Sequence, residues 1–226
     1  MGRHHRGSFR LEHYAEPRGR GGGLEQPEEQ RSALIEHLES NGVPESSQNT
    51  LADKIEAGEP LESEIKSAIP IRETSTTQNG FTVTRKDYSD GSFMESSVEI
   101  GETAPPGAVE PQAIKGCSST GGSGYRQMPN CLVYVNAPTY SANFRATWVY
   151  QQNGTGVISK AWDSSLQVYL GTYSNKTFSI TRKTSSGSTP AQVQLKWKYT
   201  AVGGVAQGDS AIYLNVFAND AWTTTN

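Results

Sequence analysis

The segment AQVQLKWKYT, residues 191–200, alternates strictly between apolar and polar side chains. Val193, Leu195, Trp197 and Tyr199 fall on one side of an extended chain, whereas the intervening glutamines and lysines fall on the other. Side chains alternate across a strand, so this period of two gives one apolar and one polar face. That pattern is typical of an antiparallel sheet with one face packed on a core. It constrains the fold more than any other feature of the sequence.

Similar strand patterns recur throughout the second half of the chain. They occur in CLVYVNA, SANFRATWVYQQ, TFSITRK and SAIYLNVFAN, and turn-forming pairs such as Asn153-Gly154 and Gly203-Gly204 separate the runs. Several such strands predict an antiparallel β-sandwich over residues 117–226. Trp148 and Trp197 fall on apolar faces, and we expect both in its core.

The first half of the chain has a different composition. Residues 1–116 hold 12 Lys/Arg and 20 Asp/Glu, whereas residues 117–226 hold 8 and 3, together with 15 of the 20 aromatic side chains. Residues 1–23 are rich in glycine and charge, and we interpret them as a disordered tail or an artefact of the assigned start. They lack the apolar centre of a signal peptide. No stretch approaches the roughly 20 apolar residues of a transmembrane helix.

Two short helices and a β-hairpin are predicted between the tail and the sandwich. Leu34, Ile35 and Leu38 form a helical stripe, and residues 24–60 as a whole read as a helical hairpin. Residues 61–116 read as a linker, a hairpin at 80–100 with Asp-Gly at its turn, and a Pro/Gly linker. The predicted class is therefore α+β, mainly β.

The segment CSSTGGSGYRQMPNC contains the two cysteines of the chain, Cys117 and Cys131. A zinc site needs three or four ligands, and all four histidines lie at or before residue 37, so we predict no metal and no cofactor. The spacing is not that of a C-x-x-C redox pair. A disulfide is the favoured interpretation, with two free thiols as the alternative. A disulfide would indicate an oxidising compartment.

The order of these segments resembles a group of uncharacterised secreted β-rich proteins of actinobacteria. The likeness is carried by an acidic helical pair, the hairpin TVTRKDYSDGSFMESSVEI, the segment APPGAVEPQAIKGC with its GSGY and NC continuation, and an aromatic β-rich end. It covers roughly residues 28–222. The resemblance implies secretion and a disulfide, but it implies no activity and no catalytic residues.

Candidate catalytic groups are sparse, so whether the protein is an enzyme stays open, with a non-catalytic role favoured. His37 is expected at the surface of its helix, and no G-x-S-x-G motif is present. Paired-carboxylate chemistry would have to bring an acid of the second half close to an acid of the hairpin. These acids are Asp163, Asp209 and Asp220 in the second half, and Asp87, Glu95 and Glu99 in the hairpin.

A binding role is the favoured interpretation. The cations of the second half are scattered, which argues against nucleic acid as a partner. Aromatic side chains outside the regular strand patterns are candidates for a ligand-binding platform: Trp162, Trp222, Tyr125, Tyr140 and Tyr173. We therefore expect a secreted or cell-surface binding module whose partner is a cell-wall glycan or a surface protein. The alternatives are a secreted hydrolase of cell-wall glycan and a secreted effector or toxin-like protein.

Overall fold

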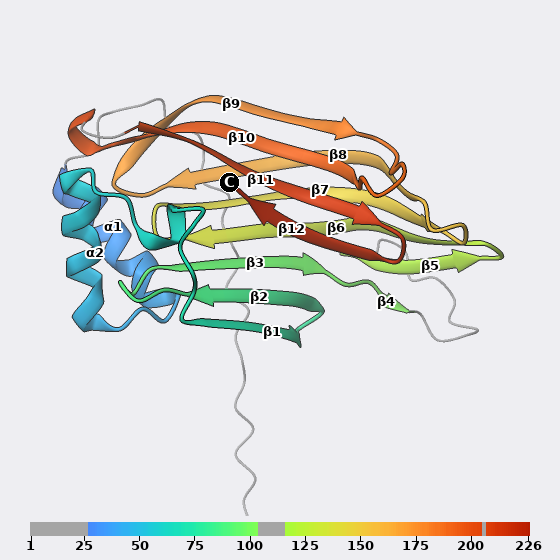
Figure 1. Ribbon diagram of the computed structural model, residues 1–226, viewed down its shortest axis with the longest axis horizontal. Coiled ribbons are helices and arrows are strands. Elements are labelled where there is room, and N and C mark those ends of the chain that lie inside the picture. Colours follow the sequence, from blue (N-terminus) through green and yellow to red (C-terminus); the bar gives the residue numbers. More distant parts are fainter. Residues whose placement is uncertain (1–26, 104–115, 205–206) are drawn as a thin grey trace, which may run out of the picture.

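The computed structural model describes residues 27–103, 116–204 and 207–226, in which a helical pair lies at one end of two stacked β-sheets (Figure 1). The helical elements are α1 (Pro27–Ser40), α2 (Glu45–Ala57), and the 3-10 turns η1 (Glu62–Glu64) and η2 (Val202–Gly204). The strands are β1 (Arg72–Gln78), β2 (Phe81–Asp87), β3 (Phe93–Glu99), β4 (Glu102–Thr103), β5 (Ser118–Gly122), β6 (Tyr125–Ala137), β7 (Tyr140–Gln151), β8 (Gly156–Val168), β9 (Gly171–Arg182), β10 (Ala191–Ala201), β11 (Gln207–Phe217) and β12 (Asp220–Thr225). The predicted α+β class is confirmed, whereas the predicted tail, residues 1–23, lies outside the described residues.

The strands form a wide sheet and a narrow one. The larger sheet is six strands across, in the order β1-β2-β3-β6-β7-β8. Strand β6 pairs with β3 through residues 133–136 and with β5 through residues 125–127, so β3 and β5 lie end to end along one side of β6. The smaller sheet has the order β12-β11-β10-β9. All these pairings are antiparallel except that of β4 with β5.

The core lies between the two sheets and follows the period-two pattern. Val193, Leu195 and Trp197 of β10 are completely buried, as are Val133 of β6 and Phe144 of β7. The ring of Tyr140 meets Trp197 edge-on, with 4.8 Å between the ring centroids. Trp148 is also buried, so the expectation that both tryptophans belong to the core is confirmed.

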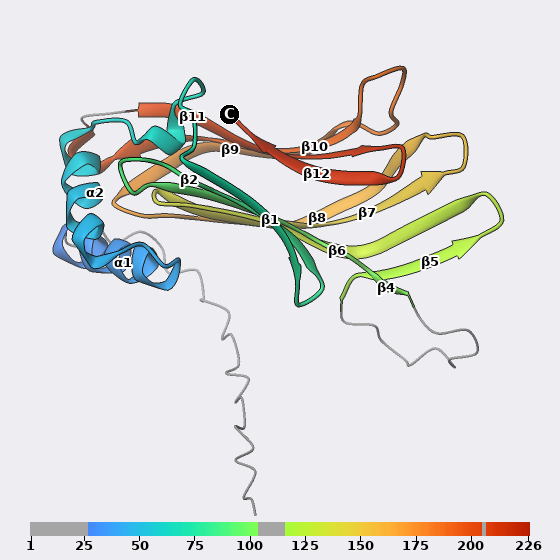
Figure 2. The same ribbon diagram turned by 60° about the horizontal axis from the view of Figure 1, so that its bottom comes forward.

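The sandwich is closed along one long edge. The chain passes from β8 in the larger sheet directly into β9 in the smaller one, and the amide of Ile158 donates to the carbonyl of Lys183 at 2.8 Å. The smaller sheet therefore lies over the β8 side of the larger sheet, and its last strand, β12, lies against β3. Strands β2 and β1 of the larger sheet extend past the edge of the smaller sheet at β12. Figure 2 shows the two layers from a second direction.

Strand β1 falls in a stretch that the sequence predicts to be a linker. All seven of its residues are exposed, and its sequence RETSTTQ has no apolar alternation. Pairing with β2 over the whole of its length, rather than burial of a face, makes it a strand. The predicted hairpin is formed by β2 and β3. Gly91 in its turn has φ 86°, and a Cβ there would lie 2.8 Å from Cβ of Ser47 on α2.

The helical pair packs on one end of the sandwich. Leu34 and Leu38 of α1 and Leu51 of α2 are completely buried in a second apolar cluster, which also includes Phe93 of β3 and Leu170 of the β8–β9 turn. Short amphipathic helices are marginal by themselves. Burial against the strand ends therefore supplies the stabilisation that the two helices lack alone.

The expectation that His37 lies at the helix surface is wrong. Its side chain is buried and stacks on Tyr169, with ring centroids 3.9 Å apart. Nε2 donates to the carbonyl of Ala137 at 2.8 Å, and Asn41 Nδ2 donates to Nδ1 at 3.2 Å. These partners fit the neutral imidazole, which has one donor and one acceptor. Burial lowers the pKa of His37, and the bond to Ala137 opposes this effect.

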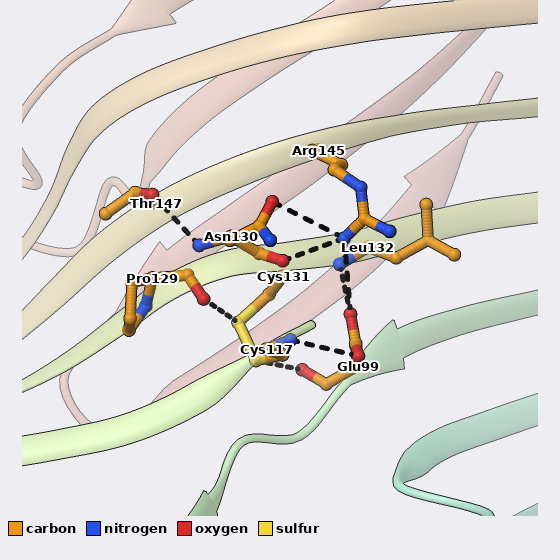
Figure 3. Close-up of a disulfide and its surroundings, with 8 residues drawn as sticks. All are labelled: Glu99, Cys117, Pro129, Asn130, Cys131, Leu132, Arg145 and Thr147. Carbon is orange, nitrogen blue, oxygen red and sulfur yellow. Dashed lines mark hydrogen bonds and ion pairs between the residues drawn. A yellow bond between two sulfur atoms is a disulfide. The ribbon is translucent and has the colours of Figure 1, made fainter. Parts of the chain in front are cut away.

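The predicted disulfide between Cys117 and Cys131 is confirmed, and it lies where β3 ends beside β6 (Figure 3). Glu99, the last residue of β3, accepts through Oε1 from the amide of Cys117 at 3.0 Å and through Oε2 from the amide of Leu132 at 2.7 Å. The guanidinium of Arg145 lies 3.8 Å from Oε2 of Glu99. The disulfide and this carboxylate together hold the start of β5 against the sheet at the gap between β3 and β5.

Reducing the disulfide should lower the free energy of unfolding. The linked cysteines are 14 positions apart in sequence, and opening a loop of this size costs about 3 kcal/mol in the chain-entropy model. Urea denaturation with and without reductant would measure the loss. The double variant Cys117→Ser with Cys131→Ser should match the reduced protein and should not respond to reductant. Equal stability of oxidised and reduced protein would contradict a stabilising role.

Acidification should destabilise the docked helices through His37. Because burial lowers its pKa in the folded state, the unfolded chain takes up a proton first as the pH falls. The contribution of neutral His37 to stability is therefore present above the pKa of the histidine in the unfolded chain. It is lost as the pH falls toward the pKa in the folded protein. Relative to His37→Gln, the wild type should lose stability between about pH 7 and pH 5, with a limiting slope of about 1.4 kcal/mol per pH unit. Parallel curves from denaturation at each pH would contradict this role.

Candidate ligand-binding groove

The open edge of the sandwich carries a continuous groove. A cavity of about 880 Å³ lies at its helical end, and a second of about 480 Å³ lies between β12 and the hairpin strands. The two have five lining residues in common, namely Ser63, Lys86, Tyr88, Met94 and Thr225. We therefore treat both cavities as one site, the open-edge groove.

The floor of the open-edge groove is the part of the larger sheet that extends beyond the smaller one. Val98 belongs to the core, and its cross-strand neighbour Thr82 lies on the same face of the sheet. Continuing this register puts Thr84 of β2, Ser75 of β1 and Ser96 of β3 on that face as well. All four hydroxyl-bearing residues line the groove. The floor is thus polar where the sheet is uncovered and apolar where it is covered.

Strand β12 forms the opposite wall, and all six of its residues line the groove. In the described part of the chain it is the last strand of the smaller sheet, hydrogen-bonded to β11. The outer side of an edge strand presents unpaired N–H and C=O groups at alternate residues. This wall therefore offers backbone donors and acceptors as well as side chains.

The carboxyl group of Glu64 in η1 lies at the helical end, on a residue that is exposed overall. Oε1 accepts from Thr139 Oγ1 at 2.7 Å, and Oε2 accepts from the amide of Leu61 at 3.4 Å. Burial raises the pKa of Glu64 above its ordinary range, because the charged form is poorly solvated, and the two hydrogen bonds only partly oppose this effect. Tyr140 and Tyr199 line the same cavity.

The groove is acidic, and its rim is apolar. Five carboxylates line it, those of Glu59, Glu64, Glu73, Asp209 and Asp220, against the ammonium groups of Lys66 and Lys86. Beside it, the segment between η1 and β1 exposes Ile65, Ile69 and Ile71, with relative exposures of 40%, 84% and 70%. Ile65 itself lines the cavity, as does Pro70 between the other two. Clustered exposed aliphatic side chains are typical of interaction surfaces.

The aromatic residues proposed from the sequence lie on different elements. Trp222 of β12 and Tyr140 of β7 line the groove, although Tyr140 is buried and its hydroxyl group faces Met94. Trp162 is half-buried on β8 beneath Lys160, whose ammonium group lies 4.6 Å from the ring centroid. Tyr125 begins β6 and Tyr173 lies in β9, both exposed. The structure thus brings two of the five to this site.

The acids considered for catalysis are also dispersed. Asp209 lies near the start of β11, lines the groove and pairs with Lys196 at 3.5 Å. The hairpin acids point to other partners: Asp87 pairs with Arg85 at 2.8 Å, and Glu99 bonds beside the disulfide. Asp163, at φ 52°, lies in the irregular part of β8, near a register shift relative to β7.

One of the carboxyl groups in the groove, that of Glu64, comes from the predicted linker. Its sequence context, LESEIK, has no periodicity that would mark it as part of a site. Over residues 27–103, 116–204 and 207–226 no group of three potential metal ligands occurs. No helix in those ranges has the length and hydropathy needed to cross a bilayer.

Stability should depend on pH through Glu64 in the opposite sense to His37. Its pKa is raised on folding, so the folded protein keeps a proton that the unfolded chain has lost. The contribution of Glu64 to stability is full below its pKa in the unfolded chain. It disappears as the pH rises through its pKa in the folded protein. The stability of the wild type relative to Glu64→Gln should therefore fall as the pH rises above the unfolded pKa of about 4.3, as measured by urea denaturation. A difference that is constant or that grows with pH would contradict a raised pKa for this acid.

Comparison with family models gives no match, and no curated protein matches the chain. Among solved structures, the crystal structure of the hypothetical protein lmo2686 from Listeria monocytogenes EGD-e is similar, with 19% identity over 66% of this chain and 95% of that chain. The TM-score is 0.36, which carries no argument about fold or function. These comparisons assign no activity to the chain.

Proposed function

We propose that the protein is a non-catalytic binding module that acts outside the cytosol and holds an extended segment of a protein partner in the open-edge groove. The observation that carries the proposal is the groove itself, in which an edge strand, a hydroxyl-lined floor and an acidic end form one continuous surface. A cavity with a few converging polar groups is the usual form of a binding site.

The disulfide supports the location. Structural disulfides persist in oxidising compartments and are rare in the cytosol. The bond between Cys117 and Cys131 closes a gap in the sheet rather than joining exposed loops, which is a structural role. This is in keeping with the secretion implied by the resemblance to actinobacterial proteins.

The chemistry of the rim supports a polypeptide rather than a glycan. Glycan sites depend on aromatic rings that stack on sugar faces, and the candidate aromatics lie on separate elements. The rim instead exposes three isoleucines, which can pack against apolar side chains of a protein. An unpaired strand edge is a second feature that matches a polypeptide, because it pairs with a backbone.

The geometry supports the hydrolase alternative less well. Acid/base cleavage of a glycosidic bond uses two carboxyl groups on either side of the scissile bond. The acid at the helical end of the groove, Glu64, bonds to Thr139 and to the backbone of Leu61, and the hairpin acids bond elsewhere. The effector alternative shares the binding role and differs only in the partner.

Blocking the floor of the groove should abolish binding, whereas the same change on the opposite face should not. Thr82 and Thr76 are both exposed, on paired strands, but only Thr82 lines the groove. The variants Thr82→Trp and Thr76→Trp are thus matched in size and exposure. We expect random displayed peptides of about 12 residues to be enriched by the wild type and by Thr76→Trp, and their affinity for Thr82→Trp to fall at least about tenfold.

An array of wall oligosaccharides, probed with the same three proteins, forms the second arm. Thermal unfolding of both variants should match the wild type, because each change adds a side chain at an exposed position. Failure to enrich any peptide, or equal affinity for all three proteins, would overturn the proposal. Oligosaccharide binding that Thr82→Trp abolishes would retain the groove and replace the protein partner by a glycan.

A further inference from the structure

We propose that the ligand segment adds to β12 as a fifth strand of the smaller sheet, lying above β2, and that it carries basic side chains toward the end of the groove beside Thr225. This inference rests on the proposed function and specifies the bonding mode and the chemistry of the ligand.

The unequal widths of the two sheets leave room for the added strand. The larger sheet is six strands across, whereas the smaller one has four and ends at β12, which lies against β3. A strand paired to the free edge of β12 would lie about 4.8 Å farther out, which continues the smaller sheet over the next strand of the larger one, β2. The cavity of about 480 Å³ occupies this position, between β12 and the floor residues of β1 to β3.

The free edge of β12 is suited to pairing. Natural edge strands are commonly blocked by lysine, proline or a bulge. The sequence of β12, Asp-Ala-Trp-Thr-Thr-Thr, has neither lysine nor proline, and its pairing with β11 shows no register shift. Tryptophan and threonine favour extended backbone. A partner of about six extended residues would match the length of β12 and span about 20 Å.

The outer edge of β1 provides a contrast on the same molecule. That strand begins with Arg72 and Glu73, whose charged side chains pair across to Asp87 and Lys86 of β2. Charged side chains on an edge discourage pairing with another chain. The edge of β1 thus carries two charged residues at its start, whereas the edge of β12 carries one, Asp220, followed by five uncharged residues.

The charge of the groove selects the ligand. Three of its five carboxylates, those of Glu59, Glu64 and Asp209, line the larger cavity at the helical end, and Thr225 lines it too. A strand that runs along β12 would bring its residues beside Thr225 into this cavity. Lys66 and Lys86 line this cavity as well, and Lys196 pairs with Asp209, so the excess of carboxyl groups belongs to the groove as a whole, with five against two lysines. Lysine or arginine side chains of the ligand would offset that excess, and an acidic segment would be repelled.

The test uses the peptides enriched by the full-length protein in the preceding selection, made as end-blocked synthetic copies. Each copy carries one N-methyl group at successive positions, which removes a single backbone donor and changes no side chain. We expect affinity to fall at least about tenfold at alternate positions and to stay near the parent value at those between, because alternate N–H groups of an added strand face β12. Hydrogen exchange of the bound protein should slow at alternate amides of β12.

Charge is tested with the same peptides. Replacing their lysines and arginines by glutamine should weaken binding, and raising the salt concentration should weaken only the basic parent peptide. Equal effects of N-methylation at all positions, unchanged exchange in β12 or enrichment of acidic peptides would overturn this inference. If such peptides still lose affinity for Thr82→Trp, the proposed function stands. If no peptide is enriched at all, both proposals fail together.

Discussion

The passage of the chain from β8 into β9 is the constraint on which the rest of the molecule depends. It joins the two sheets along one long edge, and the hydrogen bond between Ile158 and Lys183 ties them again farther along. Side chains such as Trp197 then hold the layers at the spacing of a packed sandwich, about 10 Å. The two sheets are joined at their β8 and β9 edges. The last strand of the four-stranded sheet, β12, therefore lies over β3. The part of the open-edge groove between β12 and the hairpin strands therefore follows from strand count and connectivity, whereas the segment around η1 lines its helical end.

The helical pair builds the closed end of that groove. Asp90 in the β2–β3 turn accepts from the amide of Glu62 at 3.1 Å and pairs with Lys54 of α2 at 3.2 Å, so η1 is held between helix and hairpin. His37 attaches α1 to Ala137, two residues before Thr139, which bonds Glu64. Helix docking and the position of Glu64 in the groove thus share one network of contacts. Protonation acts on its two ends in opposite senses, because burial lowers the pKa of His37 and raises that of Glu64.

The sequence predicts the parts of this structure in which burial alternates with a fixed period. Strand β10 is recognisable because Val193, Leu195 and Trp197 face a dry core and their neighbours face water. Strand β1 is not, because both of its faces are exposed and pairing with β2 alone defines it. Glu64 and His37 were missed for a related reason, since distant segments bury His37 and the partner of Glu64, Thr139, is also distant in the sequence. Trp222 was proposed from its irregular context, but its position in the wall depends on the unequal sheet widths, which no local pattern encodes.

The uncovered floor and Glu64 act together if the site binds as proposed. The floor can stay exposed without a ligand because its hydroxyl groups are solvated by water, so an empty groove costs little free energy. Glu64 behaves differently, because its surroundings favour the neutral acid. A basic side chain brought beside it would favour the carboxylate, and ligand binding would then be coupled to release of a proton. In this binding mode the edge of β12 supplies affinity for any extended backbone. The acidic end of the groove supplies a selectivity for basic side chains that depends on pH.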